Sequence, residues 1–340
     1  LGIIGIAREV GLLTNTPLKL PKIRLSESKQ AVNQLVKIRI DDPIGCPRYA
    51  TRLLQNVEVK PSPNWMIKRL NAVGIRAISN LVDVSNYVMM ETGQPLHAFD
   101  FDTLAQGAII VRRASAGEKF TTLDDRMHEL KAHDLLICDA AKPVALAGVM
   151  GGLNSEVKDT TRNVLIECAH FERISVRRTG KRLGIASEAS RRFERGTDAN
   201  NIPFVLHHTV QLMQMTGGGE IVRGIADEYP KPVKPAKVSF RPKRVTHVLG
   251  IKVPNAKMEK ILTGLECKVN KKDATKWQVT MPTFRPDLTR EIDLIEEVAR
   301  VHGFEHIVED LHSNVPIDTE TNREEIVIEK IRQAMTGLGL

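Results

Sequence analysis

A proline-rich segment constrains the fold of this 340-residue chain more than any other feature. Residues 229–235 read YPKPVKP, and proline neither continues a helix interior nor donates to a central strand. The segment follows three consecutive glycines at 217–219, which are typical of a helix end. We therefore predict one domain over residues 1–229, a linker over 230–236 and a smaller domain over 237–310.

The periodicity of residues 1–229 predicts an α+β domain. Ser62 is predicted to cap a first helix, with Pro63 at its first position. Helical spacing over residues 80–90 up to Gly93 and over 202–213 predicts two more helices. Helices that flank a mostly antiparallel block of strands are typical of the α+β class. Short apolar runs bounded by turn residues predict the buried strands of that block, at 108–111, 135–138, 144–147 and 164–166.

The residues after the linker predict a strand, two helices, a strand pair and a further helix. The strongest helix is predicted over 288–302, with Leu288, Ile292 and Ile295 on its apolar face and the acidic residues on another face. A last amphipathic helix is predicted around residues 326–335.

Composition excludes several classes of protein. No apolar run reaches the roughly 18 residues that a membrane-spanning helix needs. The four cysteines are scattered singly, which fits a reducing cytoplasm and argues against a disulfide or a cysteine-ligated zinc site. The net charge of +8 is consistent with a polyanionic partner. The motifs of zinc proteases, P-loop NTPases, serine hydrolases and dinucleotide-binding dehydrogenases are absent.

A histidine, a glutamate and a glycine-rich turn are candidates for a functional site. His97 follows Pro95 in a predicted loop, where it either positions a water or caps a turn. Glu167 ends an apolar strand, so its carboxylate is either paired structurally or directed at a ligand. The glycines between Gly148 and Gly152 either expose N–H groups to an oxyanion or form an ordinary hairpin.

Two charged clusters also leave two interpretations open. Eight basic residues lie between Arg173 and Arg195, which is typical of phosphate contact or of a solvated helix face. An acidic group in the smaller domain either binds a hard cation such as Mg²⁺ or complements a helix dipole and nearby arginines. This group consists of Asp287, Asp293, Glu296 and Glu297.

Five longer strings stand out along the chain. They are GIAREV at 5–10, ISNLVDVSNY at 78–87, GQPLHAFD at 93–100, EASRRFERG at 188–196 and EEVARVHG at 296–303. In this order they resemble the family of bacterial phenylalanine–tRNA ligase β-subunits. The resemblance implies that residues 1–229 are a tRNA-editing domain and that 237–310 form a small winged-helix-like domain. Residues 311–340 would begin the next, catalytic-like domain, with other modules of the family lying outside this chain.

The resemblance also implies a function and partners. The family hydrolyses mischarged Tyr-tRNA(Phe) and supports an α-subunit, in a cytoplasmic α2β2 complex, during ATP-dependent charging of tRNA(Phe). The synthetic site belongs to the α-subunit, so this chain would use no ATP itself and would at most be an editing hydrolase. Mg²⁺ would bind in association with the α-subunit. The alternatives are a non-catalytic RNA-binding and assembly module and an unrelated Mg²⁺-dependent hydrolase.

The matching positions define a predicted site. His97 and Asn86 would organise the hydrolytic water and substrate, and Glu167 would recognise the tyrosine hydroxyl. Where some relatives have threonine, this chain has Ser85 and Ser187, which keep the hydroxyl and lose a methyl group. The predicted pocket residues are Ser85, Gly148, Gly151, Ser187 and Ala189. The predicted tRNA contacts are Arg177, Arg178, Lys181, Arg182, Arg191, Arg192 and Arg195, and the predicted metal ligands are Asp287, Asp293, Glu296 and Glu297.

Overall fold

The computed structural model describes residues 2–273, 275–307 and 322–340. The chain forms two compact units, one up to His302 and one from Gly303 onward. The second unit contains helix α10 (Arg323–Gly337), which confirms the helix predicted around residues 326–335. The predicted start of a further domain at 311 lies in a segment, 308–321, that is outside the described residues. All predicted site residues lie in the first unit.

A six-stranded sheet forms the centre of the first unit. Its order is β1-β12-β3-β11-β4, with β13 also paired to β3. Strands β3 and β11 are antiparallel over seven residue pairs, and both are buried almost throughout. The strands are β1 (Glu27–Ala31), β3 (Arg48–Gln55), β4 (His97–Asp100), β11 (Val164–His170), β12 (Glu220–Arg223) and β13 (Ala226–Glu228).

A five-stranded sheet of order β10-β9-β8-β5-β2 packs on one face of the first sheet. Most pairs in both sheets are antiparallel, whereas β1–β12 and β2–β5 are parallel. The strands are β2 (Lys37–Ile40), β5 (Ala108–Arg113), β8 (Leu135–Cys138), β9 (Pro143–Leu146) and β10 (Met150–Gly151). A separate hairpin consists of β6 (Lys119–Thr121) and β7 (Met127–Glu129).

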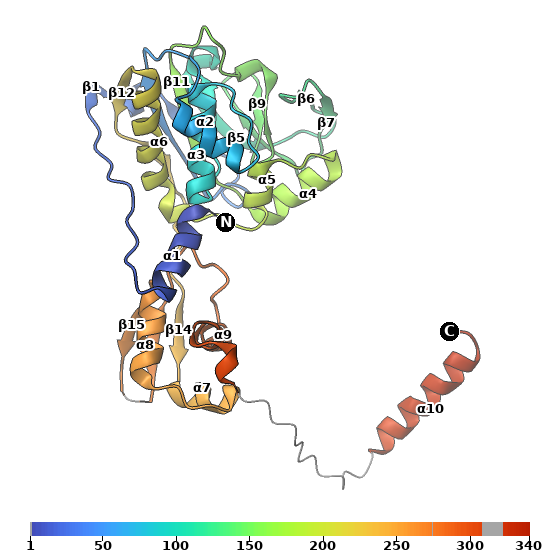
Figure 1. The fold of residues 1–340 in the computed structure, drawn as a ribbon. Coiled ribbons are helices and arrows are strands. Elements are labelled where there is room, and N and C mark those ends of the chain that lie inside the picture. Colours follow the sequence, from blue (N-terminus) through green and yellow to red (C-terminus); the bar gives the residue numbers. More distant parts are fainter. Residues whose placement is uncertain (1, 274, 308–321) are drawn as a thin grey trace. The chain divides into compact units, whose positions relative to one another are not determined.

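Helices cover the opposite face of the six-stranded sheet (Figure 1). These are α2 (Asn64–Ala72), α3 (Asn80–Thr92) and α6 (Ile202–Gly217). Alternate residues of β3 and β11 therefore enter two cores, one against the second sheet and one against the helices. Helices α4 (Arg173–Leu183) and α5 (Glu188–Phe193) adjoin the core between the sheets. This arrangement confirms the predicted α+β class and the four predicted strands.

The predicted end of helix α3 is correct, whereas the predicted start of helix α2 is wrong. Helix α3 ends at Gly93, whose φ of 78° allows the left-handed conformation that the glycine predicted. By contrast, Ser62 does not cap α2. Its hydroxyl donates to Asp83 at 2.6 Å, and the helix begins only at Asn64 after Pro63. A tertiary hydrogen bond has replaced the local cap.

The smaller predicted domain has its own core around Trp277. Its element order agrees with the prediction: β14 (Lys237–Phe240), α7 (Pro242–Leu249), α8 (Asn255–Gly264), β15 (Lys268–Lys271), β16 (Trp277–Thr280) and α9 (Glu291–His302). The three strands form one antiparallel sheet. The linker at 230–236 lies between this core and the other two, although chain contacts keep all three in one unit. The domain bounds and the winged-helix comparison stay predictions.

The apolar face predicted for the last helix of this domain is correct in part. Leu288 and Ile295 are buried as predicted, whereas Ile292 is 44% exposed, and α9 begins at Glu291 rather than at Leu288. The apolar residues of α9 that are buried are Leu294, Ile295, Val298 and Ala299. Two of the acids predicted to lie away from the core, Asp293 and Glu297, are buried as well, and each is paired with arginine.

The remaining elements complete the first unit. Helix α1 (Ile3–Leu13) precedes the sheets. All four cysteines are buried and free. In the described part of the chain, no helix is long and apolar enough to cross a bilayer. Short 3-10 helices lie at Val32–Gln34, Phe101–Thr103, Ala105–Gly107, Leu153–Ser155, Ala199–Asn201 and, in the second unit, Phe304–His306.

Candidate active site

Strand register places the two principal candidate side chains next to each other. Glu167 on β11 pairs with His97 on β4 and, on its other side, with Thr51 on β3. Leu165 and Ala169, the alternate residues of β11, enter the core between the two sheets. Glu167 and its two paired neighbours therefore share the face that looks toward the second sheet.

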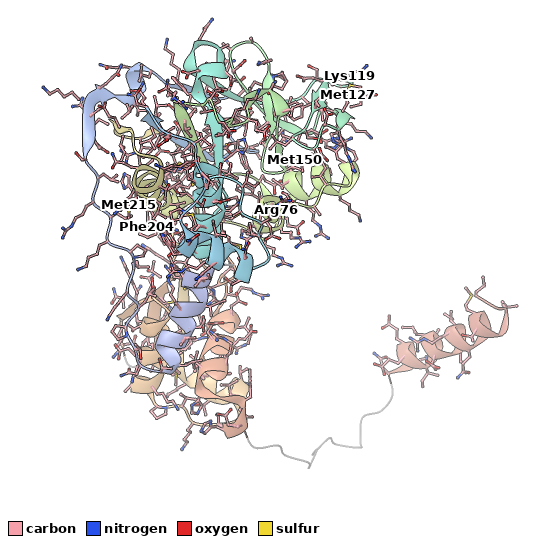
Figure 2. All side chains as sticks on the ribbon, turned by 45° about the horizontal axis from the view of Figure 1, so that its top comes forward. Arg76, Lys119, Met127, Met150, Phe204 and Met215 are labelled. Atoms are coloured by element: carbon pink, nitrogen blue, oxygen red, sulfur yellow. The ribbon has the colours of Figure 1, made fainter. Side chains whose placement is uncertain are left out.

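A small cavity of about 70 Å³ lies where this face meets the glycine turn after β9. Of the predicted site residues, it brings together His97, Glu167, Gly148, Gly151 and Ala189. Such a volume holds a few ordered waters. An aromatic ring needs more room, so its entry requires movement of a lining side chain, and the unbranched Met150, labelled in Figure 2, is suited to this. The other lining residues are Pro95, Leu96, Ile137, Ala145, Leu146, Val149 and Phe193.

Glu167 is a buried carboxyl whose cost of burial is offset by few polar partners. It is 6% exposed, and burial raises its pKa to about 8. The nearby Tyr49 hydroxyl acts in the opposite direction and lowers this pKa. That hydroxyl is buried but does not reach the geometry of a full hydrogen bond. The carboxyl is therefore held in the cavity without the partners that a structural ion pair would give it.

His97 is the first residue of β4, not a loop residue as predicted. Burial lowers the pKa of its imidazole to about 4, so the ring is neutral at physiological pH. Its Nε2 atom is buried and has no hydrogen-bond partner among the described residues. The ring packs edge-on against Phe99, with 4.5 Å between ring centroids. A neutral imidazole with a free nitrogen can orient a water or accept a proton.

The glycine turn is shaped by close contacts. A Cβ at Gly151 would lie 2.6 Å from Cε1 of His97, so glycine leaves the space that the imidazole occupies. Gly148 has a φ of 69°, and a Cβ there would meet Val176, Phe171 and Phe193. The N–H groups of Ala147, Val149 and Gly152 donate to carbonyl groups. Among the described residues, no hydrogen bond joins the Gly148 N–H to another group, which makes it the turn's available donor.

Three predicted site residues lie outside the cavity lining. Ser85 and Asn86 are on α3, and the Ser85 hydroxyl donates to the Leu81 carbonyl at 3.3 Å. Ser187 caps α5, and its hydroxyl also donates to the Val149 carbonyl at 2.8 Å, which ties the helix start to the glycine turn. The functional roles of Ser85 and Asn86 stay predictions.

The predicted tRNA contacts include side chains with and without ion-pair partners, and Arg191 is an exposed side chain that pairs with Glu188. Arg182 pairs with the fully buried Asp134, and Arg192 bonds to Glu188 at 2.7 Å. These two guanidinium groups stabilise the fold. The exposed members without a recorded ion pair in the described chain are Arg177, Arg178, Lys181 and Arg195.

A basic groove of about 660 Å³ lies beside the cavity. Residues of α4 and α5 line it, including Arg177, Lys181, Arg191 and Arg195. Helix α5 contributes to both spaces, since Ala189 and Phe193 line the cavity while other residues of the same helix line the groove. A polyanion bound along the groove would thus lie one helix away from Glu167.

The predicted metal ligands do not converge. Glu297 bonds to Arg285 at 3.0 Å and to Arg300 at 2.7 Å, while Asp287 bonds to Arg285 at 2.6 Å. Asp293 bonds to Arg290 and accepts from backbone N–H groups at the start of α9. Glu296 is exposed. No group of three potential ligands comes together among the described residues, so this arrangement does not fit a resident cation.

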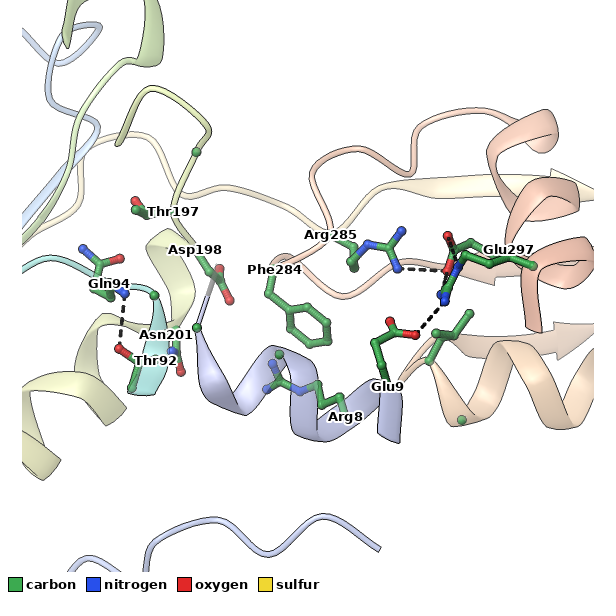
Figure 3. A pocket seen from close by; sticks show the side chains of 17 residues that line it. Arg8, Glu9, Thr92, Gln94, Thr197, Asp198, Asn201, Phe284, Arg285 and Glu297 are labelled. Carbon is green, nitrogen blue, oxygen red and sulfur yellow. Dashed lines mark hydrogen bonds and ion pairs between the residues drawn. The ribbon is translucent and has the colours of Figure 1, made fainter. Parts of the chain in front are cut away.

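A larger cavity of about 390 Å³ is lined by α1, by the smaller domain and by residues near Gln94 and Asp198 (Figure 3). Its charged groups already have partners within the first unit. Glu9 bonds to Arg300 at 2.8 Å, and Arg8 bonds to Glu266 while lying 4.0 Å over the Phe284 ring. These pairs join α1 to the smaller domain, and we assign no ligand to this cavity.

Sequence reasoning did not identify Tyr49 and Thr51 as site residues. They do not line the cavity but lie on β3, the neighbour of β11, on the face that carries Glu167. Alternation within residues 48–55 was the available signal, since Tyr49, Thr51 and Leu53 share one face of the strand.

Comparisons with known proteins identify the family of the domain that carries these residues. The family model of the B3/4 domain matches residues 45–218, and that of the tRNA synthetase B5 domain matches residues 238–304. The chain is 45% identical over its full length to a phenylalanine–tRNA ligase beta subunit of Syntrophus aciditrophicus, covering 42% of it. It is 40% identical over its full length to that of Thermotoga maritima, again covering 42%.

A third relative, from Oleidesulfovibrio alaskensis, is 46% identical over 90% of the chain and 38% of the relative. The chain thus spans about two fifths of the length of these relatives. A solved N-terminal fragment of the phenylalanyl-tRNA synthetase β-subunit from Pyrococcus horikoshii aligns over 88% of this chain and 82% of that one, with 15% identity and a TM-score of 0.42. The chain belongs to the B3/4 domain family, joined here to a B5 domain as in the β-subunits of phenylalanine–tRNA ligase.

Proposed function

We propose that this chain is the proofreading part of a phenylalanine–tRNA ligase β-subunit and hydrolyses Tyr-tRNA(Phe). One observation carries the proposal: Glu167 and His97 are paired across adjacent strands and face a cavity closed by Gly148 and Gly151. Buried polar groups without partners are rare in folded proteins and point to a ligand or ordered water. The ligand that best fits a buried carboxyl in an apolar pocket is a ring that carries a hydroxyl group.

Selectivity follows from the chemistry of Glu167. An apolar synthetic pocket rejects an added hydroxyl by only about 10², so tyrosine in place of phenylalanine requires a second check. In the cavity, a tyrosine hydroxyl donates to the Glu167 carboxyl, whereas phenylalanine leaves that carboxyl unpaired. An unpaired buried polar group costs about 1–3 kcal/mol, which favours removal of tyrosine over the correct amino acid.

Hydrolysis requires a placed water and a donor to the developing oxyanion. The neutral imidazole of His97 is suited to orient the water that attacks the ester carbonyl. The Gly148 N–H, which has no other hydrogen bond among the described residues, is suited to donate to the oxyanion. Tyrosine and free tRNA(Phe) leave as the products.

The four unpaired cations beside α5 support contact with the tRNA acceptor end. Replacing Arg177 and Lys181 together by glutamine should weaken RNA binding and reduce its salt dependence. The same change at Arg182 and Arg192 should chiefly reduce stability, because both have internal partners. Equal losses of affinity from both pairs at matched stability would contradict this division.

The remaining predictions concern the complete enzyme. We propose that the full β-subunit supports an α-subunit in a cytoplasmic α2β2 complex that charges tRNA(Phe) with ATP. A Mg²⁺ ion bound with the α-subunit stays a prediction. The acids Asp287, Asp293, Glu296 and Glu297 take no part in the proposed hydrolysis.

The deciding experiment measures deacylation of Tyr-tRNA(Phe) by the 340-residue chain. We expect release of tyrosine above the buffer rate, with Glu167→Ala reducing the preference for Tyr-tRNA over Phe-tRNA and His97→Ala reducing the rate with both. No release above buffer would contradict the hydrolytic function and favour the alternative, a non-catalytic RNA-binding and assembly module. Equal preference in the wild type and Glu167→Ala would remove the role assigned to Glu167.

A further inference from the structure

Two more buried hydroxyl groups surround Glu167 on the side away from His97. Thr51 is the direct partner of Glu167 across β3 and β11, and Tyr49 is the partner of Ala169, two residues farther along. Both side chains therefore lie on the face of the sheet that carries Glu167. Tyr49 and Thr51 are fully buried, and neither hydroxyl has a hydrogen-bond partner among the described residues.

The Tyr49 hydroxyl interacts electrostatically with the Glu167 carboxyl. It is close enough to the carboxyl to influence its ionisation, and the carboxyl in turn raises the pKa of the phenol. The rest of the tyrosine ring packs in the apolar core between the two sheets. A phenol placed there costs free energy unless its O–H finds an acceptor. Glu167 is the carboxyl whose pKa this hydroxyl lowers, which makes it the candidate acceptor.

We propose that Tyr49 is a positioning residue for editing: its hydroxyl donates to one oxygen of Glu167 and so directs the other oxygen toward the substrate hydroxyl. The inference rests on the proposed function and adds to it the group that orients the specificity carboxylate. A carboxylate can accept several hydrogen bonds at once, so the two donors do not compete. Thr51 is the direct cross-strand partner of Glu167 on the same face.

This arrangement also sets the charge of Glu167. A hydrogen bond to the charged form of a carboxyl favours ionisation and offsets part of the cost of burial. The other titratable groups around it are uncharged at neutral pH, since burial lowers the pKa of His97 and raises those of Cys46 and Cys168. The residues of β9, β10 and α5 that line the cavity carry no charge. Tyr49 is thus the polar group that favours the ionised carboxylate.

The test removes one oxygen atom. Tyr49→Phe keeps the ring and its packing, and the matched control Tyr87→Phe removes a phenol hydroxyl that accepts from Arg69 instead. With Tyr49→Phe we expect the preference for Tyr-tRNA over Phe-tRNA to fall about three- to tenfold at pH 7. After subtraction of buffer hydrolysis, the deacylation rate should increase with pH as Glu167 ionises, and in Tyr49→Phe this increase should occur at higher pH. Most of the preference lost at pH 7 should therefore be recovered near pH 9.

Two outcomes would overturn the inference without touching the proposed function. One is a Tyr49→Phe chain with wild-type preference and an unchanged pH profile. The other is a uniform loss with both substrates at every pH, which indicates a packing defect and would be accompanied by a lower melting temperature. If the wild-type chain itself releases no tyrosine, the proposed function fails. In that case, ¹³C NMR of the Glu167 carboxyl still tests Tyr49, since Tyr49→Phe should raise its midpoint of titration.

Discussion

The surroundings of Glu167 and the acidic group on α9 both contain buried polar groups, but only those on α9 have partners. Around Glu167, His97 Nε2 and the hydroxyls of Tyr49 and Thr51 are buried without hydrogen-bond partners in the described chain. On α9, the buried carboxylates of Asp293 and Glu297 are each bonded to arginines. Sequence alone made both regions candidate sites. The difference teaches that satisfied charges hold a fold together, whereas buried polar groups left open indicate where a ligand binds.

The largest effect should come from breaking the ion pairs of Glu297 on α9. Glu297→Ala leaves Arg285 and Arg300 without their shared partner, and we expect a loss of about 3 kcal/mol. This is the lower end for a broken buried pair, because Arg300 is partly exposed. Urea unfolding followed by Trp277 fluorescence in a Trp65→Phe background reports on this core. Glu296→Ala, on the exposed side of the same helix, is the control and should change stability by less than about 0.5 kcal/mol.

Filling the open site should change activity and leave the fold intact. Gly151→Ala places a methyl group against the His97 ring, which must turn away from the position where it orients water. We expect about ten- to a hundredfold slower deacylation of Tyr-tRNA(Phe), with circular dichroism unchanged. Gly5→Ala, where nothing lies within 4 Å of the added methyl, is the control. Wild-type activity in Gly151→Ala would argue against His97 as the water-orienting group.

The smallest effect tests the charge of Glu167. Its pKa lies near 8 in the folded chain against 4.5 as the ordinary value, so the folded state holds a proton that the unfolded state has released. Stability present below about pH 4.5 should therefore be lost progressively as the pH rises to about 8. Glu167→Gln should flatten this loss and stabilise the chain by about 1–2 kcal/mol at pH 8 while reducing selectivity. A pH dependence identical to that of the exposed-residue control Glu220→Gln would contradict the shift.

Sequence reasoning anticipated the α+β class and most elements because periodicity and helix ends are local signals. Gly93 ended α3 as predicted, since a left-handed residue there needs no distant partner. Ser62 failed as a cap because Asp83, twenty-one residues away, accepts its hydroxyl. The pairing of Glu167 with His97 depends on strand register, which local patterns do not specify. Whether Glu297 is paired depends partly on Arg285, which lies outside α9 and twelve residues before Glu297, whereas Arg300 on the same helix is a local partner.

The row Thr51–Glu167–His97 has a consequence for how such a site can change. Its side chains are spaced by the hydrogen bonds between three neighbouring strands and not by a loop. Because successive residues of a strand face opposite sides, a single-residue insertion before Glu167 would turn its carboxyl into the core formed with the helices. Variation of this pocket is therefore confined to substitutions, since any change of length in β11 exchanges the chemistry of one face for that of the other.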